Sequence, residues 1–460
     1  MLLESFYKII ANIIHARLLP IAEALDNETQ CGFRPGRSCS DAIFAVKMAM
    51  RKRKEHNQET YILFLDLVKA FDRVPRELLW QVLKKSGVPD KLISLITKLH
   101  SNVSVNFRIA EISRSFNNTI GVKQGDTLGP LLFIFFITAI LHTWRKTSSV
   151  APCIFKSTPL LYKLSGRRVS TQGDIFLFRD SAYADDTAAA FKSRANIEVG
   201  GKELIEHFAK FGMEVHTGYT LDQTKKSKSK ILHVPLPQRN NLAPIENDTT
   251  PIDCGNSRNI PITNSFNYLG SVTSAEATDS ADVLERISAA NKAFGALREP
   301  VFSSRKIARI AKVALYRFLI IPILLYGAEC WVLTSRDESL LRTFHNNCAR
   351  AIIRIYRKRQ FRNYISTQTI LNKLRLPRIE SLYARHVLRW AGHLARMKYN
   401  RLPRRFINSW TSNNRPTGSP NLTYARHLFK IMRRHNINPR NWHTMAANRE
   451  QWSKIIKDIH

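Results

Sequence analysis

The spacing of apolar and polar positions predicts a strand followed by helices early in the chain. Tyr61 to Leu65 form a continuous apolar run that ends at Asp66, a pattern typical of a buried strand that finishes in an acid. The segments LWQVLKKSG and DKLISLITKLH have the apolar spacing of two helices. The run LLFIFFITAI predicts a third, apolar helix, and we expect Gly129 at its N-cap and Pro130 at its first position.

The remaining pattern alternates between strands and helices and then becomes helical. SVNFRI and SFNNTI predict a hairpin. The stretch 220–264, which is rich in Pro, Asn and Lys, is expected to be a loop or insertion. From Ala281 onwards the apolar spacing is that of helices, and the first 60 residues are mainly helical as well. The pattern therefore indicates the α+β class.

Two adjacent aspartates, Asp185 and Asp186 in SAYADDTAAA, lie between apolar, strand-like flanks. Side chains alternate along a strand, so neighbouring aspartates at a hairpin tip do not share one face, and a further carboxylate must come from elsewhere. Asp66 is available for this role. Three aspartates from two strands would form an oxygen-rich site suited to two Mg²⁺ ions, with Mn²⁺ as a substitute. Taken alone, each motif fits a simple turn or strand end equally well.

The segments around these aspartates resemble the reverse transcriptases of non-LTR (LINE-type) retrotransposons. YADD and FLDLVKAFD stand in that family's order. Gln30 to Phe44, QCGFRPGRSCSDAIF, resembles its fingers motif with paired arginines. Gly121 to Phe133, GVKQGDTLGPLLF, resembles its glutamine-glycine motif, and Phe266 to Ser271, FNYLGS, its primer-grip hairpin. The resemblance runs from about Tyr7 to the C-terminus.

This resemblance implies an RNA-directed DNA polymerase, which is a nucleotidyltransferase. Asp66, Asp185 and Asp186 would hold the two Mg²⁺ ions, a primer 3′-hydroxyl would attack the α-phosphate of a dNTP, and pyrophosphate would leave. The implied partners are an RNA template, a DNA primer or target DNA, and dNTPs. The implied fold is a right-hand polymerase with partial fingers, a palm built on an antiparallel sheet, a helical thumb and a basic, mainly helical C-terminal region.

Five residues are expected at the incoming nucleotide by resemblance. Phe71 would abut the sugar and exclude a 2′-hydroxyl, although an apolar aromatic in such a run is also typical of a core position. Gln124 would contact the nucleotide or its template base, and Tyr183 of YADD would lie beside it. Arg34 and Arg37 flank a turn that could present both guanidiniums to one anion, or either could brace the fingers against the palm.

Two further sets of residues are expected by resemblance to bind the substrates. One lysine of TKKSKSK would lie near the triphosphate, and the register leaves four candidates open. The primer grip would hold the primer strand. The lysine candidates are Lys225, Lys226, Lys228 and Lys230, and the primer-grip residues are Phe266, Tyr268, Leu269 and Gly270.

The formal net charge of +35 over 460 residues implies a polyanionic partner. The last 120 residues hold 26 lysines and arginines but three acidic residues, so +23 of that charge lies in this region. Such a surface binds a phosphate backbone in a salt-dependent way. Four tryptophans are interleaved with these cations, and we favour core packing over base stacking for Trp390, Trp410, Trp442 and Trp452.

The cysteines and apolar runs exclude several other classes. None of the six cysteines forms a CxxC pair or a Cys/His cluster with zinc spacing, so we expect no zinc site and reduced, intracellular thiols. A nuclear location is implied by the resemblance alone. No signal peptide is apparent, and the apolar runs at 131–141 and 318–326 are too short to span a bilayer, so we expect no membrane partner.

Four regions follow from the pattern and the resemblance: partial fingers (1–60), palm with the primer-grip hairpin (61–275), helical thumb (276–345) and a basic nucleic-acid-binding region (346–460). The fingers segment that precedes Tyr7 in similar enzymes, and an N-terminal endonuclease domain, are missing from this sequence, so we expect a truncated chain. The alternative function is therefore an inactive retrotransposon fragment that still binds RNA or DNA. An intron maturase would share the palm but is less similar in FLDLVKAFD and the tail.

Overall fold

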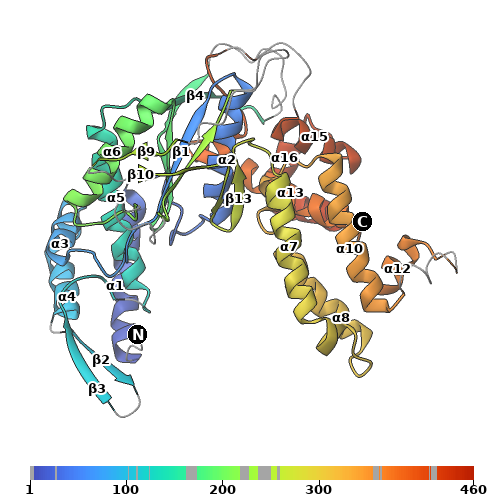
Figure 1. Ribbon diagram of the computed structural model, residues 1–460, viewed down its shortest axis with the longest axis horizontal. Coiled ribbons are helices and arrows are strands. Elements are labelled where there is room, and N and C mark those ends of the chain that lie inside the picture. Colours follow the sequence, from blue (N-terminus) through green and yellow to red (C-terminus); the bar gives the residue numbers. More distant parts are fainter. Residues whose placement is uncertain are drawn as a thin grey trace. The chain divides into compact units, whose positions relative to one another are not determined.

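The computed structural model describes residues 5–25, 28–101, 103–109, 112–123, 125–161, 173–217, 227–236, 250–255, 259–355, 362, 365–413, 415 and 422–459. The chain forms two compact units (Figure 1). Unit 1 comprises residues 1–42, 58–154 and 177–264, and unit 2 comprises residues 43–57, 155–176 and 265–460.

Unit 1 is built on a five-stranded sheet with the strand order β11-β8-β1-β7-β6. The middle strand, β1 (Thr60–Leu65), is buried along its whole length, which confirms the strand predicted from the apolar run. It pairs antiparallel with β7 on one side and β8 on the other. Tyr61, Leu63 and Leu65 belong to the main core of this unit, together with residues of α1, α3, α5 and α6, so alternate residues of β1 face these helices.

The other elements of unit 1 include the predicted helices and hairpin. The segments LWQVLKKSG and DKLISLITKLH form α3 and α4, and SVNFRI pairs with SFNNTI as β2 and β3. The helices are α1 (Ser5–Ala24), α3 (Arg76–Lys85), α4 (Asp90–His100), α5 (Leu128–Thr147) and α6 (Arg194–Lys210); the strands besides β1 are β2 (Val103–Ile109), β3 (Ile112–Asn118), β6 (Asp180–Tyr183), β7 (Asp186–Phe191), β8 (Lys230–Val234), β9 (Ile252–Asp253), β10 (Asn259–Ile260) and β11 (Ile262–Thr263).

The apolar helix α5 is present, but its predicted start was wrong. It begins at Leu128, so Gly129 lies inside the helix and is not the N-cap. The Asp126 carboxylate accepts a hydrogen bond of 2.7 Å from the Gly129 N–H, and thus serves one of the free donors of the first turn. A Cβ at position 129 would lie 2.1 Å from the carbonyl oxygen of Lys123. The glycine is therefore explained by this close approach of two backbone segments.

The expected loop at 220–264 was also wrong in part, because the segment contributes β8 to the main sheet. Residues 218–226, 237–249 and 256–258 lie outside the described part of the chain. β8 pairs antiparallel with β1 and parallel with β11. The strand therefore depends on partners that are distant in sequence, which its local composition does not indicate.

Within the described part of the chain, α5 is the one helix that is long and apolar enough to cross a membrane. It has 20 residues and is longer than the apolar run that we judged too short to span a bilayer. In its most apolar window, 72% of the residues are buried within the protein. An apolar helix that packs on all sides is typical of a protein core.

Unit 2 is mainly helical and contains most of α2, which begins in the segment GRSCSDAIF. Its helices are α2 (Cys39–Glu55), α7 (Ser280–Ala296), α8 (Arg309–Leu315), α9 (Ile321–Leu324), α10 (Ser335–Ile353), α12 (Thr367–Leu374), α13 (Ile379–Arg396), α14 (Leu402–Phe406), α15 (Tyr424–Arg434), α16 (Trp442–Ala447) and α17 (Arg449–Lys457), with shorter turns η2 (Arg298–Phe302), η3 (Tyr316–Ile320) and η4 (Ala328–Cys330). Its strands are β12 (Ser265–Tyr268), β13 (Ser271–Ser274) and β14 (Ser409–Trp410), while β4 (Cys153–Ser157) and β5 (Asp174–Phe178) are each shared between the residues of the two units.

Tryptophans of the basic C-terminal region lie in the core of unit 2. Trp390, Trp442 and Trp452 are buried, and the Trp452 indole N–H donates to the carbonyl oxygen of Leu388 at 2.8 Å. Trp410 is half-buried. The preferred interpretation of these side chains as core residues is therefore confirmed for the three buried ones.

The mixture of a mainly antiparallel sheet with packed helices in unit 1 and a helical unit 2 confirms the predicted α+β class. The two units do not define fingers, palm or thumb boundaries. The division into four regions therefore stays a prediction.

Candidate active site

Strand pairing brings Asp66 beside the turn that carries Asp185 and Asp186. Leu65, the last residue of β1, pairs with Thr187 of β7. Asp66 follows Leu65 and Asp186 precedes Thr187, so both lie at the same end of neighbouring antiparallel strands, where opposite Cα atoms are about 4.5–5.5 Å apart. The three predicted aspartates are thus gathered at one edge of the main sheet.

Two loops hold the backbone at Asp66. Its N–H donates to the Ser229 hydroxyl at 3.1 Å, and its carbonyl oxygen accepts from the His216 N–H at 2.7 Å. The Lys228 N–H donates to the His216 ring at 3.2 Å, which links the two loops. Both backbone groups of Asp66 are therefore satisfied, which fixes the direction in which β1 delivers its carboxylate.

Two of the four lysine candidates lie in the segment that makes these contacts with Asp66. Lys228 is exposed in the loop that holds Asp66, and Lys230 is the first residue of β8. Lys225 and Lys226 lie outside the described residues.

Asp185 lies in a two-residue hairpin loop. Tyr183 pairs with Asp186, so Ala184 and Asp185 connect β6 to β7. Ala184 has a φ of 56°, in the left-handed region that non-glycine residues rarely adopt. Asp185 is half-buried and Asp186 is exposed, so the two residues differ in their exposure to solvent.

The aspartates perturb one another electrostatically. Burial raises the pKa of the Asp185 carboxyl, and the charge of Asp66 raises it further. Burial likewise raises the pKa of Asp186 to about 6, with further contributions from Asp185 and Asp66. A cation bound beside such carboxylates relieves this repulsion and favours their charged form.

The three carboxylates fit a hard cation such as Mg²⁺ that also keeps water or phosphate ligands. Among the residues that the structure describes, no group of three His, Cys, Asp or Glu side chains is arranged to hold a metal ion by itself. Mg²⁺ in phosphoryl-transfer sites is commonly bound by one or two carboxylates together with water and substrate phosphates. The donor set at this edge is of that kind, and it is not a protein-only cage.

Two aromatic residues predicted at the nucleotide, Phe71 and Tyr183, lie in the described part of unit 1. The half-buried Phe71 ring stacks on Phe133, with centroids 4.4 Å apart, so it takes part in the core as well as facing outward. A hydrogen bond with Cys39, together with burial, raises the pKa of Tyr183 to about 12. Gln124 lies outside the described residues. The nucleotide-binding role of all three stays a prediction.

Arg34 and Arg37 each bind a glutamate of unit 1. Arg34 is buried and makes two hydrogen bonds to Glu23, at 2.8 and 3.2 Å. Arg37 forms an ion pair of 2.6 Å with Glu28. Both pairs lie within residues 1–60, so bracing of the fingers against the palm stays a prediction for these two arginines. A phosphate contact by either guanidinium stays a prediction.

The predicted primer-grip residues form a hairpin in unit 2. Tyr268 of β12 pairs with Ser271 of β13, and the loop residues Leu269 and Gly270 both have positive φ, as a type I′ turn requires. The Tyr326 hydroxyl donates to the Leu269 carbonyl oxygen at 2.9 Å. Phe266 lies on β12, opposite Thr273. The hairpin is therefore present, and its contact with a primer stays a prediction.

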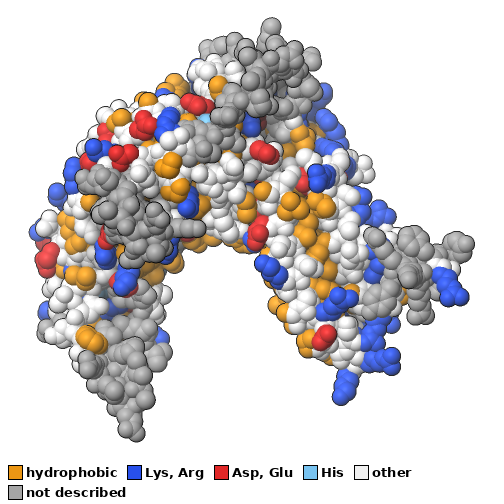
Figure 2. Space-filling model, in the orientation of Figure 1, with side chains coloured by type: hydrophobic (Ala, Val, Ile, Leu, Met, Phe, Trp, Pro, Cys, Tyr) orange, Lys and Arg blue, Asp and Glu red, His pale blue; other side chains and the backbone are white. Residues whose placement is uncertain are grey.

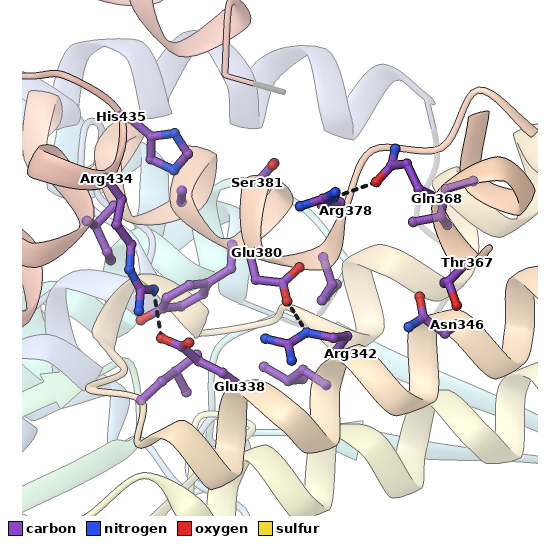
Figure 3. Close-up of a pocket in the computed structure, with 17 residues that line it drawn as sticks. Glu338, Arg342, Asn346, Thr367, Gln368, Arg378, Glu380, Ser381, Arg434 and His435 are labelled. Carbon is purple, nitrogen blue, oxygen red and sulfur yellow. Dashed lines mark hydrogen bonds and ion pairs between the residues drawn. The ribbon is translucent and has the colours of Figure 1, made fainter.

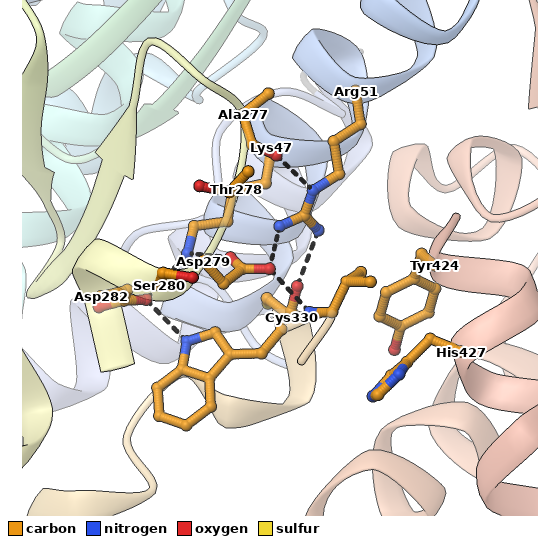
Figure 4. Close-up of polar contacts among 12 residues, drawn as sticks. Lys47, Arg51, Ala277, Thr278, Asp279, Ser280, Asp282, Cys330, Tyr424 and His427 are labelled. Carbon is orange, nitrogen blue, oxygen red and sulfur yellow. Dashed lines mark hydrogen bonds and ion pairs between the residues drawn. The ribbon is translucent and has the colours of Figure 1, made fainter. Parts of the chain in front are cut away.

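A buried ionic network holds the start of β13, next to the turn of this hairpin (Figure 4). Lys47 of α2 lies between two acids, 3.0 Å from Asp279 and 2.8 Å from Asp282. Asp282 accepts from the Val272 N–H at 2.9 Å and from the Ser271 hydroxyl. Asp282 thus joins the hairpin, α7 and α2 through one carboxylate.

The second acid of this network is held on several sides. Arg51 donates to the Asp279 carboxylate and, at 2.9 Å, to the carbonyl oxygen of Cys330. The Val332 N–H donates to Asp279 at 2.7 Å. Burial alone would raise the pKa of Asp279, but Arg51 and Lys47 outweigh it and lower that pKa. The network was not predicted from the sequence, because Lys47 and Arg51 lie more than 200 residues from the acids that they bind.

A separate pocket of about 590 Å³ lies in unit 2 among α10, α12, α13 and α15 (Figure 3). Arg434 pairs with Glu338 at 3.0 Å across it, and Arg342 pairs with Glu380. None of the predicted site residues lines this pocket. The candidate active site is therefore the aspartate edge of unit 1, which is separate from this pocket.

Comparison with known families agrees with the resemblance seen in the motifs. A family described as "Reverse transcriptase (RNA-dependent DNA polymerase)" matches residues 1–271. The matched segment includes all three aspartates, the glutamine-glycine motif and the hairpin turn. More than half of the chain is covered.

Curated relatives come from transposable elements. The probable RNA-directed DNA polymerase from transposon X-element of Drosophila melanogaster is 25% identical over 76% of this chain and 35% of that protein. The probable RNA-directed DNA polymerase from transposon BS of the same species is 24% identical over 86% of this chain and 40% of that protein. The chain thus spans little more than a third of the relatives' length.

A solved structure of telomerase from Candida albicans, with a fragment of telomeric RNA, covers 79% of this chain and 57% of that chain, at 10% identity and a TM-score of 0.37. The family match and the transposon relatives confirm the resemblance to non-LTR retrotransposon enzymes and the polymerase fold class. The chain belongs to the reverse transcriptase (RNA-dependent DNA polymerase) family.

Proposed function

We propose that this chain is an RNA-directed DNA polymerase that adds dNTPs to a primer 3′-hydroxyl. The observation that carries the proposal is the pairing of β1 with β7, which puts Asp66 next to the Asp185–Asp186 turn at one sheet edge. The raised pKa values of Asp185 and Asp186, to which burial and the neighbouring Asp66 charge both contribute, support a site that favours cations.

Asp66, Asp185 and Asp186 would hold two Mg²⁺ ions, with Mn²⁺ as a substitute. When bound, the ions activate the attacking hydroxyl and stabilise the leaving phosphate oxygen. The role of the chain is to supply carboxylate oxygens from two strands whose backbones are fixed by pairing. The water and phosphate ligands that complete such sites are consistent with the small number of protein donors at this edge.

Other residues would bind and select the substrates. Phe71, held against Phe133, would face the sugar of the dNTP, and Tyr183 would lie beside the base or sugar. Lys228 and Lys230 both adjoin Ser229, whose hydroxyl accepts a hydrogen bond from Asp66, so one of these two lysines would contact the triphosphate. Gln124 would contact the nucleotide or template base by resemblance.

Arg34 and Arg37 would stabilise the fingers segment through their ion pairs with Glu23 and Glu28. The stabilised segment would then be positioned to bind the triphosphate of the dNTP. The primer-grip residues Phe266, Tyr268, Leu269 and Gly270 would hold the primer strand by resemblance. An RNA template, a DNA primer and dNTPs are therefore the proposed partners, and the nucleus is the proposed location.

Primer extension on an RNA template with dNTPs and Mg²⁺ tests the proposal. We expect the parent chain to extend the primer and the variant Asp185→Asn/Asp186→Asn to lose activity by at least about 10³-fold, because charge stabilisation at the ions is removed. Asp90→Asn, at an exposed surface position of the same unit, is the matched control and should keep the parent rate.

The second candidate function is an inactive fragment that binds RNA or DNA. The excess of 26 cations over three acids in the last 120 residues favours nucleic-acid binding with or without catalysis. Salt-sensitive binding of the primer-template without extension by the folded parent chain, in Mg²⁺ or Mn²⁺, would establish this alternative and refute the polymerase.

A further inference from the structure

One side-chain amide holds the hairpin loop that carries Asp185. Gln30 is completely buried in unit 1. Its Oε1 accepts from the Ala184 N–H at 2.9 Å, and its Nε2 donates to the Ala184 carbonyl oxygen at 3.3 Å. Both backbone polar groups of Ala184 are thus satisfied by a residue that is 154 positions away in the sequence.

The same oxygen of Gln30 also fixes its own loop. It accepts a second hydrogen bond, of 2.8 Å, from the Gly32 N–H. Gly32 passes so close to the hairpin that a Cβ there would lie 2.4 Å from the Ala184 nitrogen and 3.0 Å from the carbonyl carbon of Tyr183. Residues 30–32 and the Ala184 turn are therefore in direct backbone contact, and the amide joins them.

Backbone bonds continue this contact along β6. The Ala182 N–H donates to the Thr29 carbonyl oxygen at 2.9 Å, and the Cys31 N–H donates to the Ala182 carbonyl oxygen at 2.8 Å. Gln30 is thereby held beside Ala182 as a parallel bridge. The position of the amide is set by these bonds and not by the side chain alone.

The turn needs such support because its conformation is unfavourable. Ala184 has a positive φ of 56° and no glycine or asparagine chemistry to favour it. A non-glycine residue in this region is strained and persists only where its surroundings fix it. Ala184 is buried, so without Gln30 its N–H and carbonyl groups would lose their side-chain partner away from water.

We propose that Gln30 is a positioning residue for the metal site: its amide fixes the Ala184 turn, and the turn aims the Asp185 carboxylate toward the edge that holds Asp66. The proposal rests on the proposed function, because it assigns the aspartates to bound ions. Gln30 itself does not touch a substrate or an ion. It acts through the backbone of Ala184.

The variant Gln30→Met tests the proposal, since methionine has a similar length but forms neither hydrogen bond. We expect the Ala184 amide to exchange faster with solvent, Mn²⁺ binding measured by electron paramagnetic resonance to weaken about tenfold, and kcat for primer extension to fall about 10–100-fold with an unchanged KM for primer-template. Gln81→Met, at an exposed position of α3, is the matched control and should change none of these values.

Gly32→Ala tests the same turn by a different route. Its Cβ would push against the Ala184 nitrogen while Gln30 remains, so it should weaken Mn²⁺ binding in the same direction. If Gln30→Met does not fold, the Mn²⁺ affinity of Gly32→Ala is measured in its place. Parent-like Mn²⁺ binding and kcat in a folded Gln30→Met protein whose Ala184 amide is no longer protected from exchange would overturn the proposal.

Mn²⁺ binding also separates this proposal from the proposed function. If the parent binds Mn²⁺ and both variants weaken that binding, but no protein extends a primer, Gln30 is established as a positioning residue and the polymerase function fails. If the parent extends primers and the Gln30 variant does so equally well, the function stands and the positioning role fails.

Discussion

Asp66, Asp185 and Asp186 are three like charges at one edge of a sheet, and their arrangement costs free energy unless a cation or proton is present. Asp185 is half-buried and Asp186 is exposed, yet the pKa of each is raised by burial and by its neighbours. Proteins rarely gather acids in this way without use, because the repulsion is relieved by ligand binding. At the scale of single residues, the site is therefore prepared for a metal.

The first prediction concerns the competition between protons and metal. The pKa of Asp186 is raised to about 6, so its carboxylate is charged above this pH and must lose a proton to bind metal below it. Below about pH 6, we expect the apparent Mn²⁺ affinity to fall by about tenfold per pH unit for every proton that metal binding releases. Asp186→Asn should remove part of this dependence. An Mn²⁺ affinity in the parent that is equal at about pH 5 and pH 7 would contradict the account.

The second prediction concerns Phe71 and sugar selection. If its ring faces the sugar, Phe71→Ala should lower the preference for dNTPs over ribonucleotides by about tenfold or more. Loss of stacking on Phe133 should also cost about 2 kcal/mol of stability. The ratio of kcat/KM for the two nucleotides is the suitable measurement, because the amount of folded protein cancels.

Phe211→Ala is the control for Phe71→Ala, since Phe211 also packs against the main core of unit 1. It should be destabilising without a change in nucleotide preference. An unchanged preference in Phe71→Ala would reduce Phe71 to a core residue.

At the scale of elements, the helices and strands that could be predicted are those determined by their own stretch of sequence. β1 follows from its apolar run, and the hairpin of Leu269 and Gly270 follows from the family motif. The start of α5 could not be predicted, because the Asp126 cap and the close approach of Lys123 to Gly129 depend on the fold of the preceding loop. The type of an element is set by spacing, whereas its boundary is set by individual contacts.

The candidate site likewise contains residues that could be predicted from the sequence and one residue that could not. The three aspartates could be selected from their motifs, but Gln30 could not, although it is the first residue of the fingers motif. Its role depends on hydrogen bonds to Ala184 that join segments 154 residues apart. β8 was missed for a similar reason, since its partners β1 and β11 are not its neighbours in the sequence.

The third prediction tests the contact of α2 with α7 and the primer-grip hairpin. Lys47→Met removes the cation between Asp279 and Asp282 and leaves buried acids with fewer donors. We expect a loss of about 3 kcal/mol or more in the free energy of unfolding, measured by urea denaturation. Lys292→Met, at an exposed position of α7, should change stability by less than about 0.5 kcal/mol. Equal stabilities of the two variants would show that the network contributes little.

At the scale of the whole molecule, charge is distributed very unevenly. The last 120 residues carry a net charge of +23 out of +35. In Figure 2, Lys and Arg side chains gather over the part of unit 2 that carries α8, α10 and α12. Because three of the four tryptophans in the last 120 residues are buried, the cations are the main features available to a nucleic acid. Binding should therefore be governed by phosphate contacts.

The fourth prediction follows from this charge. The affinity of the chain for a primer-template should fall steeply with salt, and Arg389→Gln/Arg433→Gln should reduce the slope of log K against log salt by about 1 for each phosphate that the variant no longer binds. Both arginines are exposed, on α13 and α15. Lys84→Gln, which removes an exposed pair with Asp90 in unit 1, is the control and should leave the slope unchanged. A salt-independent affinity would exclude the basic region as the binding surface.

The measurement that tests the central claim most directly is single-turnover primer extension by Asp66→Asn, Asp185→Asn and the double variant, compared with the parent chain. If the two carboxylates from β1 and the β6–β7 turn hold the same ions, each single variant should lose at least about 10³-fold in rate, and the double variant should lose little more than either one. A parent-like rate in Asp66→Asn, or losses that multiply in the double variant, would contradict a shared metal site at this sheet edge.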